Sequence, residues 1–128
     1  MNRQASYSTP STGVVVTSGA SGIGLATAEA LAAVGRPVAL WDINRDAVED
    51  NVKRLKGDFG AAAAGIGIDL RDPSMIDGAL AMTRDAIGTI GGLVHAAGSV
   101  QATGLQGVTS QSWDDGLNVH LRPLILIV

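Results

Sequence analysis

One stretch near the N-terminus constrains the fold more than any other part of the chain. An apolar, β-branched run at residues 13–17 breaks into a glycine-rich turn at residues 18–24, and the turn opens into an alanine-rich segment. A strand, a glycine turn and a helix in this order bring backbone N–H groups and the positive end of a helix dipole to one place. Gly22 and Gly24 have no Cβ to block a close approach. The stretch therefore predicts a binding site for a pyrophosphate.

The rest of the chain alternates between expected strands and expected helices. The expected strands are residues 13–17, 38–41, 61–69 and 92–97, and the expected helices are residues 22–34, 45–56, 72–87 and a last one from about 110. This alternation predicts an α/β, Rossmann-like parallel sheet with helices on both faces and the strand order 3-2-1-4. Ligands of such sheets bind at the switch point, here between the first and fourth strands.

Capping and helix-breaking residues set the expected helix boundaries. Asn44 caps the second helix, Gly57 ends it, and Asp72-Pro73 starts the third. Pro123 interrupts the last helix, because proline has no N–H to donate.

Helical periodicity predicts which residues face the sheet. On the first helix these are Ile23, Ala26, Ala30 and Val34. On the third helix they are Ile76, Leu80, Thr83 and Ile87.

Length and composition restrict the partners. The 128 residues suffice for one domain, in which residues 1–12 form a flexible polar arm without the apolar core of a signal peptide and residues 13–128 form the folded part. A net charge of -3 gives no basic footprint for nucleic acid, and the apolar run at residues 124–128 is too short to span a bilayer. The sequence has no cysteine, which excludes disulfides and thiolate metal sites. We therefore expect no nucleic-acid partner, no membrane partner and no metal, and a cytoplasmic location.

An acidic residue after the second strand favours a dinucleotide as the ligand. Asp42 lies eighteen residues after Gly24, near the spacing of the acid that hydrogen-bonds an adenosine ribose. The alternative is that Asp42 only caps the turn at Asn44. The glycine turn and the acid together favour dinucleotide binding.

Residues 13–128 resemble the N-terminal half of a short-chain dehydrogenase/reductase. The family motif Thr-Gly-x-x-x-Gly-Ile-Gly corresponds to residues 17–24, with Ser18 in place of the first family glycine. The resemblance implies a nicotinamide dinucleotide cofactor and hydride transfer between the nicotinamide and an alcohol or ketone. It also implies a preference for NAD over NADP, because the carboxylate of Asp42 repels a 2′-phosphate.

Two further segments carry the resemblance. Asp69-Leu70 matches the family's Asp-Val or Asp-Leu pair that flanks the adenine, although Asp69 alone could be a turn acid before Arg71. The family's Asn-Asn-Ala-Gly becomes the segment from His95 to Gly98, with both asparagines replaced. We expect His95 to be a strand-end histidine with satisfied hydrogen bonds, in preference to a metal ligand or an acid–base group.

The last matching segment falls on a catalytic position of the family. Counted from Trp113, the family's catalytic asparagine corresponds to His120, and Asn118 lies two residues too early. We therefore expect His120 at this position, with Asn118 as the alternative. Pro123 stands where the family commonly has glycine.

The rest of the family's catalytic set has no counterpart. The family uses a serine, a tyrosine and a lysine four residues after the tyrosine, whereas this chain has Tyr7 as its one tyrosine and Lys53 and Lys56 as its lysines. We expect a fragment truncated after the fourth strand and the following helix, with Leu93 and Val94 on an open sheet edge and no turnover by itself.

The sequence thus predicts a cofactor site and leaves alternatives for its function. The expected cofactor-binding residues are Ser18, Gly19, Ser21, Gly22, Ile23, Gly24, Asp42, Asp69, Leu70, His95, Ala97 and Gly98. A non-catalytic nucleotide-binding module and, less favoured, a Rossmann-type methyltransferase are the alternatives. The resemblance also implies a homo-oligomer that pairs through the helix beginning near Trp113.

Overall fold

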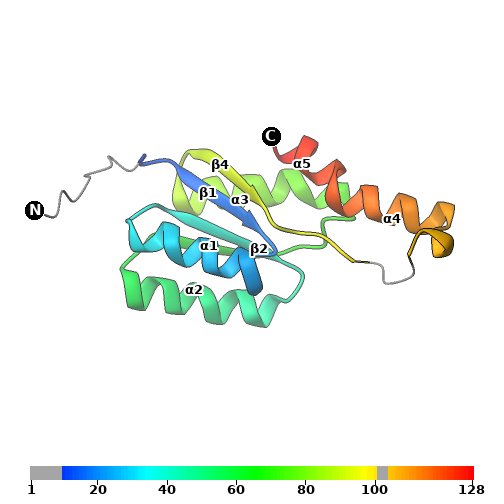
Figure 1. The fold of residues 1–128 in the computed structure, drawn as a ribbon. Helices are drawn as coiled ribbons and strands as arrows, with labels where there is room; N and C mark the ends of the chain where they lie inside the picture. The colour runs from blue at the N-terminus through cyan, green and yellow to red at the C-terminus, as the bar shows by residue number, and fades with distance from the viewer. Residues whose placement is uncertain (1–9, 101–103) are drawn as a thin grey trace, which may run out of the picture.

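The computed structural model describes residues 10–100 and 104–128, and its centre is one parallel sheet (Figure 1). The strands are β1 (Gly13–Thr17), β2 (Val38–Asp42), β3 (Ala63–Gly67) and β4 (Ile90–His95). Their order is β3-β2-β1-β4, and each neighbouring pair is parallel. The predicted fold class and strand order are confirmed. Within the described residues β4 is an edge strand, and its Leu93 and Val94 are half-buried.

Helices cover both faces of this sheet (Figure 1). They are α1 (Gly22–Ala33), α2 (Arg45–Phe59), α3 (Ile76–Ile87), α4 (Ser110–His120) and α5 (Arg122–Ile127), with short 3-10 turns η1 (Pro73–Met75) and η2 (Leu105–Gly107). The pair α1 and α2 packs on one face, and α3 with α5 packs on the other. No helix in the described ranges is both long enough and apolar enough to cross a membrane.

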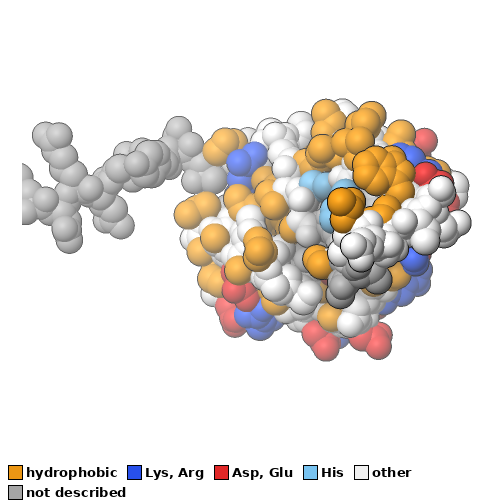
Figure 2. All heavy atoms as spheres, turned by 45° about the vertical axis from the view of Figure 1, so that its right-hand side comes forward, with side chains coloured by type: hydrophobic (Ala, Val, Ile, Leu, Met, Phe, Trp, Pro, Cys, Tyr) orange, Lys and Arg blue, Asp and Glu red, His pale blue; other side chains and the backbone are white. Residues whose placement is uncertain are grey.

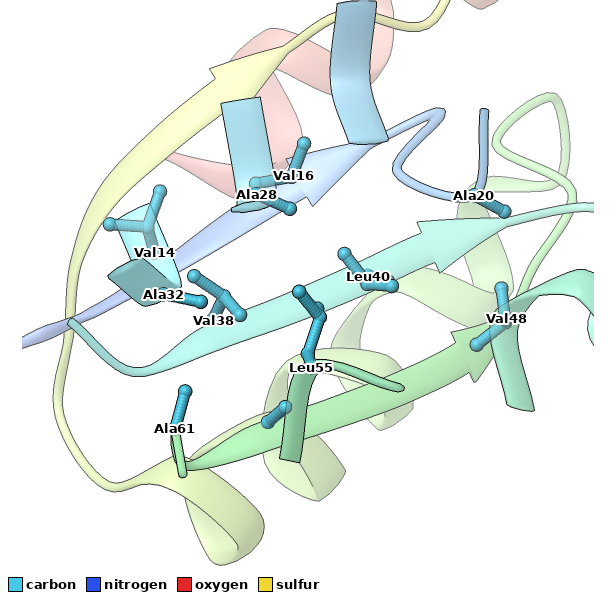
Figure 3. Packing of buried hydrophobic residues seen from close by; sticks show 11 residues of the cluster. Val14, Val16, Ala20, Ala28, Ala32, Val38, Leu40, Val48, Leu55 and Ala61 are labelled. Carbon is cyan, nitrogen blue, oxygen red and sulfur yellow. The ribbon is translucent and has the colours of Figure 1, made fainter. Parts of the chain in front are cut away.

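Alternate residues of the central strands supply two separate core layers. Val14 and Val16 of β1 point with Leu40 of β2 toward α1 and α2 (Figure 3). Val15 of β1 and Trp41 of β2 belong to the opposite layer, against α3. Because both faces are covered, the strands read as continuous apolar runs.

The prediction of which α1 residues face the sheet is wrong. The buried residues are Gly24, Ala28 and Ala32, whereas Ile23 is 82% exposed and Val34 is 59% exposed. The predicted Ala26 and Ala30 are exposed as well. Small residues face the sheet because the helix lies very close to it, and a larger side chain on that face would force the two apart. On α3 the four predicted inward residues are all buried, which confirms that prediction.

Most helix boundaries follow the predicted caps, with one clear exception. Asn44 accepts a hydrogen bond from the Ala47 N–H at 3.1 Å and caps α2 as expected. The helix does not stop at Gly57, however, but continues to Gly60, which adopts a φ of 61° and closes the helix on Lys56. A residue that tolerates positive φ is needed to end a helix in this way.

The other boundaries shift by a few residues. The third strand is shorter than the expected 61–69, and the fourth starts at Ile90 and ends at His95 instead of spanning 92–97. Asp72 caps η1 by accepting from the Ser74 N–H at 3.0 Å, so α3 is entered through a 3-10 turn. The break at Pro123 is confirmed, because α4 ends at His120 and α5 starts at Arg122.

The structure describes only the last residues of the expected N-terminal arm, residues 10–12. Residues 1–9 of the expected arm lie outside the described residues. The last residue of the expected arm, Thr12, is hydrogen-bonded to Arg36, whose Nε donates to the Thr12 carbonyl oxygen at 2.9 Å.

Candidate functional site

The turn after β1 needs glycine for two different reasons. Gly22 has a φ of 54° and open space around the position of a Cβ, so its backbone conformation is the constraint. Gly19 has no room, because a Cβ there would lie 2.8 Å from the carbonyl oxygen of Val16. Ser18, at the place of the first family glycine, also adopts a positive φ of 52°. The turn keeps a glycine-like geometry despite the serine.

The first turn of α1 offers free backbone donors. By helix geometry its first N–H groups have no acceptor within the helix. Ser21 stands at the N-cap with extended backbone angles and makes no side-chain cap, and the first turn of this helix carries no acidic residue. This helix end can therefore bind an anion. Gly22, Ile23 and Gly24, all predicted to be in the site, supply the start of the helix.

A hydrogen-bond network holds the backbone of Ala20 in the turn, at both its N–H and its carbonyl group. The Ala20 N–H donates to Oδ2 of Asp42 at 3.2 Å, and its carbonyl oxygen accepts from Nδ2 of Asn51 at 3.0 Å. Asn51 in turn accepts from Arg54 at 3.1 Å, and Arg54 forms an ion pair with Glu29. The sequence does not single out Asn51 as a site residue, since its position on α2 looks like that of an ordinary surface amide.

Asp42 caps the turn and still has acceptor capacity to spare. Its Oδ1 accepts from the Asn44 N–H at 3.0 Å, which confirms the capping role. The side chain also lines a cavity at the carboxyl ends of the strands. Because a carboxylate has about four lone-pair sites, the two backbone contacts leave room for further hydrogen-bond donors.

The cavity at this edge of the sheet has a volume of about 380 Å³. Such a volume lies in the range of small-molecule sites. Six predicted residues line it, namely Ser18, Asp42, Asp69, Leu70, Ala97 and Gly98. The residues that the sequence did not single out are Trp41, Ile43, Ile68, Arg71, Ser99, Asp115 and Val119. The predicted residues Gly19, Ser21, Gly22, Ile23, Gly24 and His95 are not part of its lining.

A tight ion pair forms one wall of the cavity. Nε and Nη2 of Arg71 donate to the two carboxylate oxygens of Asp69 at 3.0 and 2.7 Å. The Arg71 N–H adds a bond to Oδ1 at 3.0 Å, so Asp69 is the turn acid that the sequence allowed. Hydrogen bonds from Arg71 hold the pKa of Asp69 below its ordinary value. Asp69 therefore faces the cavity as a fixed carboxylate.

His95 joins two strands and a helix through its ring. Its Nδ1 lies 2.9 Å from Oγ1 of Thr17, and its Nε2 lies 3.0 Å from the carbonyl oxygen of His120. Thr17 also accepts from the Ala97 N–H at 3.1 Å. Both ring nitrogens are occupied, which agrees with the expected strand-end histidine.

The structure brings His120, and not Asn118, to the end of β4. Nε2 of His120 lies 3.1 Å from the nitrogen and 3.0 Å from the oxygen of Ser99. The ring covers Gly98, where a Cβ would lie 2.9 Å from its Nδ1. Asn118 instead lines a separate surface groove with Leu121. Within the described ranges, no group of three or more His, Cys, Asp or Glu side chains could hold a metal ion.

The face formed by α4 and α5 is apolar. Figure 2 shows hydrophobic side chains gathered around the pale blue histidine atoms. Trp113 is 62% exposed and Ile125 is 67% exposed. This face contains the helix through which the resemblance predicts pairing of two copies.

Comparisons with known proteins agree with this geometry. The family model of short chain dehydrogenases matches residues 12–128. A probable galactose dehydrogenase of Rhizobium meliloti is 35% identical over 90% of this chain and 45% of its own length. A D-threitol dehydrogenase of Mycolicibacterium smegmatis is 33% identical over 88% of this chain and 43% of its own length.

A solved structure shares the fold. L-sorbose reductase of Gluconobacter frateurii, complexed with NADPH and L-sorbose, superposes with a TM-score of 0.84 at 25% identity, and the match covers 91% of this chain and 44% of the reductase. The chain thus spans less than half the length of these relatives. The matching family model, the glycine turn and the strand order together show that this chain belongs to the short-chain dehydrogenase family of oxidoreductases.

Proposed function

We propose that this chain holds the dinucleotide of an NAD-dependent oxidoreductase that interconverts an alcohol and a ketone. The supporting observation is that the uncapped start of α1 follows directly on the turn whose Ser18 lines the cavity at Asp42, at the carboxyl end of the sheet. In this proposal the pyrophosphate contacts Gly19, Ser21, Gly22, Ile23 and Gly24. Family membership displaces the methyltransferase alternative.

Different cavity residues contact the other parts of the cofactor in this proposal. Asp42 accepts the adenosine ribose hydroxyls, while Asp69 and Leu70 flank the adenine. Ala97 and Gly98 line the path toward the nicotinamide. When bound, the cofactor supplies the hydride chemistry. The chain supplies orientation, because Asp42 and Asn51 already hold the backbone of Ala20 in place.

The choice between NAD and NADP depends on Asp42 in this proposal. A carboxylate at the ribose disfavours a 2′-phosphate through like-charge repulsion. The cationic wall residue Arg71 is engaged by Asp69 and does not offset this repulsion. The L-sorbose reductase structure holds NADPH, so the phosphorylated cofactor is the competitor to test.

Titration of the chain with NADH and with NADPH, followed by nicotinamide fluorescence, tests this choice. We expect NADH to bind at least tenfold more tightly, a difference of about 1.4 kcal/mol. Asp42→Asn should reduce this ratio, whereas Asp50→Asn, which removes the same charge from the exposed side of α2, should leave it unchanged. Equal or tighter binding of NADPH by the unmodified chain would contradict the proposed preference.

We further propose that the 128-residue chain has no turnover by itself. The family resemblance implies a catalytic tyrosine with a lysine four residues later. The one tyrosine of this chain is Tyr7, and its two lysines, Lys53 and Lys56, lie on α2 and do not line the cavity at Asp42. The same observation favours a non-catalytic nucleotide-binding module as the second candidate. Assay of NADH formation with a panel of sugars and polyols tests the lack of turnover. Cofactor binding without turnover fits both candidates, and measurable alcohol oxidation by the pure chain would refute the lack of turnover.

A further inference from the structure

The helix α4 is attached to the rest of the domain mainly at its C-terminal end. It contains no fully buried residue, and the contacts that it makes as an element are mainly with α5. Its C-terminal residue, however, is hydrogen-bonded to the sheet. The carbonyl oxygen of His120 lies 3.0 Å from Nε2 of His95, and the ring of His120 lies within hydrogen-bond distance of Ser99, just after β4.

We propose that His95 is a positioning residue that fixes the end of α4, and with it the His120 ring, beside the nicotinamide end of the site. The proposal rests on the proposed function for its ligand, while the attachment of α4 can be tested without any ligand. His95 acts here through His120 and not by touching the cofactor, because both of its ring nitrogens are occupied by protein atoms.

Two hydrogen bonds in this chain of contacts have a fixed direction, because one partner of each can act in only one way. The Ala97 N–H can only donate, so Oγ1 of Thr17 accepts from it. The His120 carbonyl can only accept, so Nε2 of His95 carries the proton. The hydroxyl of Thr17 is then free to donate to Nδ1 of His95. The contact with the His120 carbonyl therefore requires a hydrogen on Nε2 of His95.

Helix termination explains why such a donor is useful at His120. The last carbonyl groups of a helix lack donors from within the helix. Pro123 adds to this shortage because it has no N–H, and α4 ends at His120 while α5 begins at Arg122. Nε2 of His95 supplies one donor from the sheet to the carbonyl group of the last residue of α4.

The fixed end of α4 determines where the His120 ring lies. The ring covers Gly98, whose missing Cβ leaves the space that the ring occupies. Its Nε2 lies within hydrogen-bond distance of both the nitrogen and the oxygen of Ser99. Gly98 and Ser99 also line the cavity, so a shift of α4 would move the His120 ring at the wall of the site.

Two substitutions at position 95 distinguish the hydrogen bond to Thr17 from the hydrogen bond to His120. The side-chain amide of glutamine can place a donor near the position of Nε2, so His95→Gln keeps the bond to His120. Asparagine reaches only about as far as Nδ1, so His95→Asn keeps a partner for Thr17 and loses the bond to α4. Asparagine is also the residue that the family resemblance places here, so His95→Asn introduces a side chain that this fold accommodates.

Hydrogen exchange of the 128-residue chain, followed by mass spectrometry, tests the attachment. We expect His95→Asn to speed exchange in α4 at least tenfold and to leave β1 and β2 unchanged, while His95→Gln stays within about twofold of the unmodified chain. Unchanged exchange of α4 in His95→Asn, or equal loosening in both variants, would overturn the proposal. Long-range nitrogen–proton NMR spectra should show a hydrogen on Nε2 of His95, and an Nε2 without a hydrogen would overturn the proposal as well.

Binding of NADH tests the link to the cofactor site. We expect His95→Asn to weaken NADH binding at least threefold and His95→Gln to retain most of the affinity. If the unmodified chain binds NADH and His95→Asn loosens α4 without changing the affinity, the positioning role at the site is wrong. If the unmodified chain does not bind NADH, the proposed function fails, and hydrogen exchange and NMR still decide the role of His95.

Discussion

The close approach of α1 to the turn predicts opposite effects for one substitution at two glycines. A Cβ on Gly24 would overlap the carbonyl oxygen of Ser18 and lie 2.8 Å from its carbonyl carbon. These are backbone atoms, so they cannot swing away as the end of a side chain could. At Gly78 in α3, a Cβ would meet nothing within 4 Å.

The magnitudes follow from packing and helix propensity. Alanine is favoured over glycine inside a helix by about 1 kcal/mol. At Gly78 this gain stands alone, so Gly78→Ala should stabilise the fold by about 1 kcal/mol. At Gly24 the overlap costs up to about 3 kcal/mol, which leaves a net loss of about 2 kcal/mol for Gly24→Ala.

Urea unfolding followed by far-ultraviolet circular dichroism measures both variants. The unmodified chain is the reference, and Gly78→Ala controls for the change in helix propensity. Gly24→Ala should also weaken NADH binding, because the turn has to move to admit the new methyl group. If Gly24→Ala were as stable as the unmodified chain, the close packing of α1 against Ser18 would be refuted.

Three further predictions concern single contacts. Thr83→Val leaves the buried indole N–H of Trp41, which donates to Oγ1 of Thr83 at 3.0 Å, without a partner, and should lower the unfolding free energy measured in urea by about 1–3 kcal/mol. Arg71 lowers the pKa of Asp69 below its ordinary 3.8, so the pair stabilises the fold above about pH 4 and loses this effect as the pH falls through the lowered pKa. Arg71→Gln should therefore flatten the dependence of the urea midpoint on pH in acid, and an unchanged dependence would contradict the role of the pair. Ser18→Gly removes the strain of a positive φ, worth about 1–2 kcal/mol, but raises the entropy cost of folding by about 0.5–1 kcal/mol. Thermal unfolding should therefore show a small stabilisation, and a clear loss of stability would count against strain at Ser18.

Local patterns predict the sheet and the turn well, because a few neighbouring residues determine each of them. The same patterns do not decide which glycine ends α2. Glycine inside a helix costs only about 1 kcal/mol, so α2 passes through Gly57. Gly60 ends it because that residue takes the left-handed conformation, and the sequence does not mark this choice.

Periodicity fails on α1 because it ranks residues by hydrophobicity and not by size. Ile23 is more apolar than Ala28, yet Ala28 is buried and Ile23 is exposed. The distance between helix and sheet decides which residue fits, and that distance depends on Gly24 and the turn.

The polar contacts of the site are beyond the reach of sequence patterns for a different reason. Asn51 bonds to Ala20 across 31 positions, and His95 bonds to His120 across 25. Each of these residues has a sequence neighbourhood typical of a surface or of a strand end. Only the folded backbone brings the partners together.

The carboxylate of Asp42 couples the turn thermodynamically to the ribose contact that we propose. Since Oδ2 accepts from the Ala20 N–H, any replacement of Asp42 should also loosen the loop that we propose binds the phosphates. Affinity losses from paired substitutions at Asp42 and Asn51 should accordingly be non-additive, because both side chains hold the backbone of one residue, Ala20. A double-mutant cycle would measure that interaction energy directly.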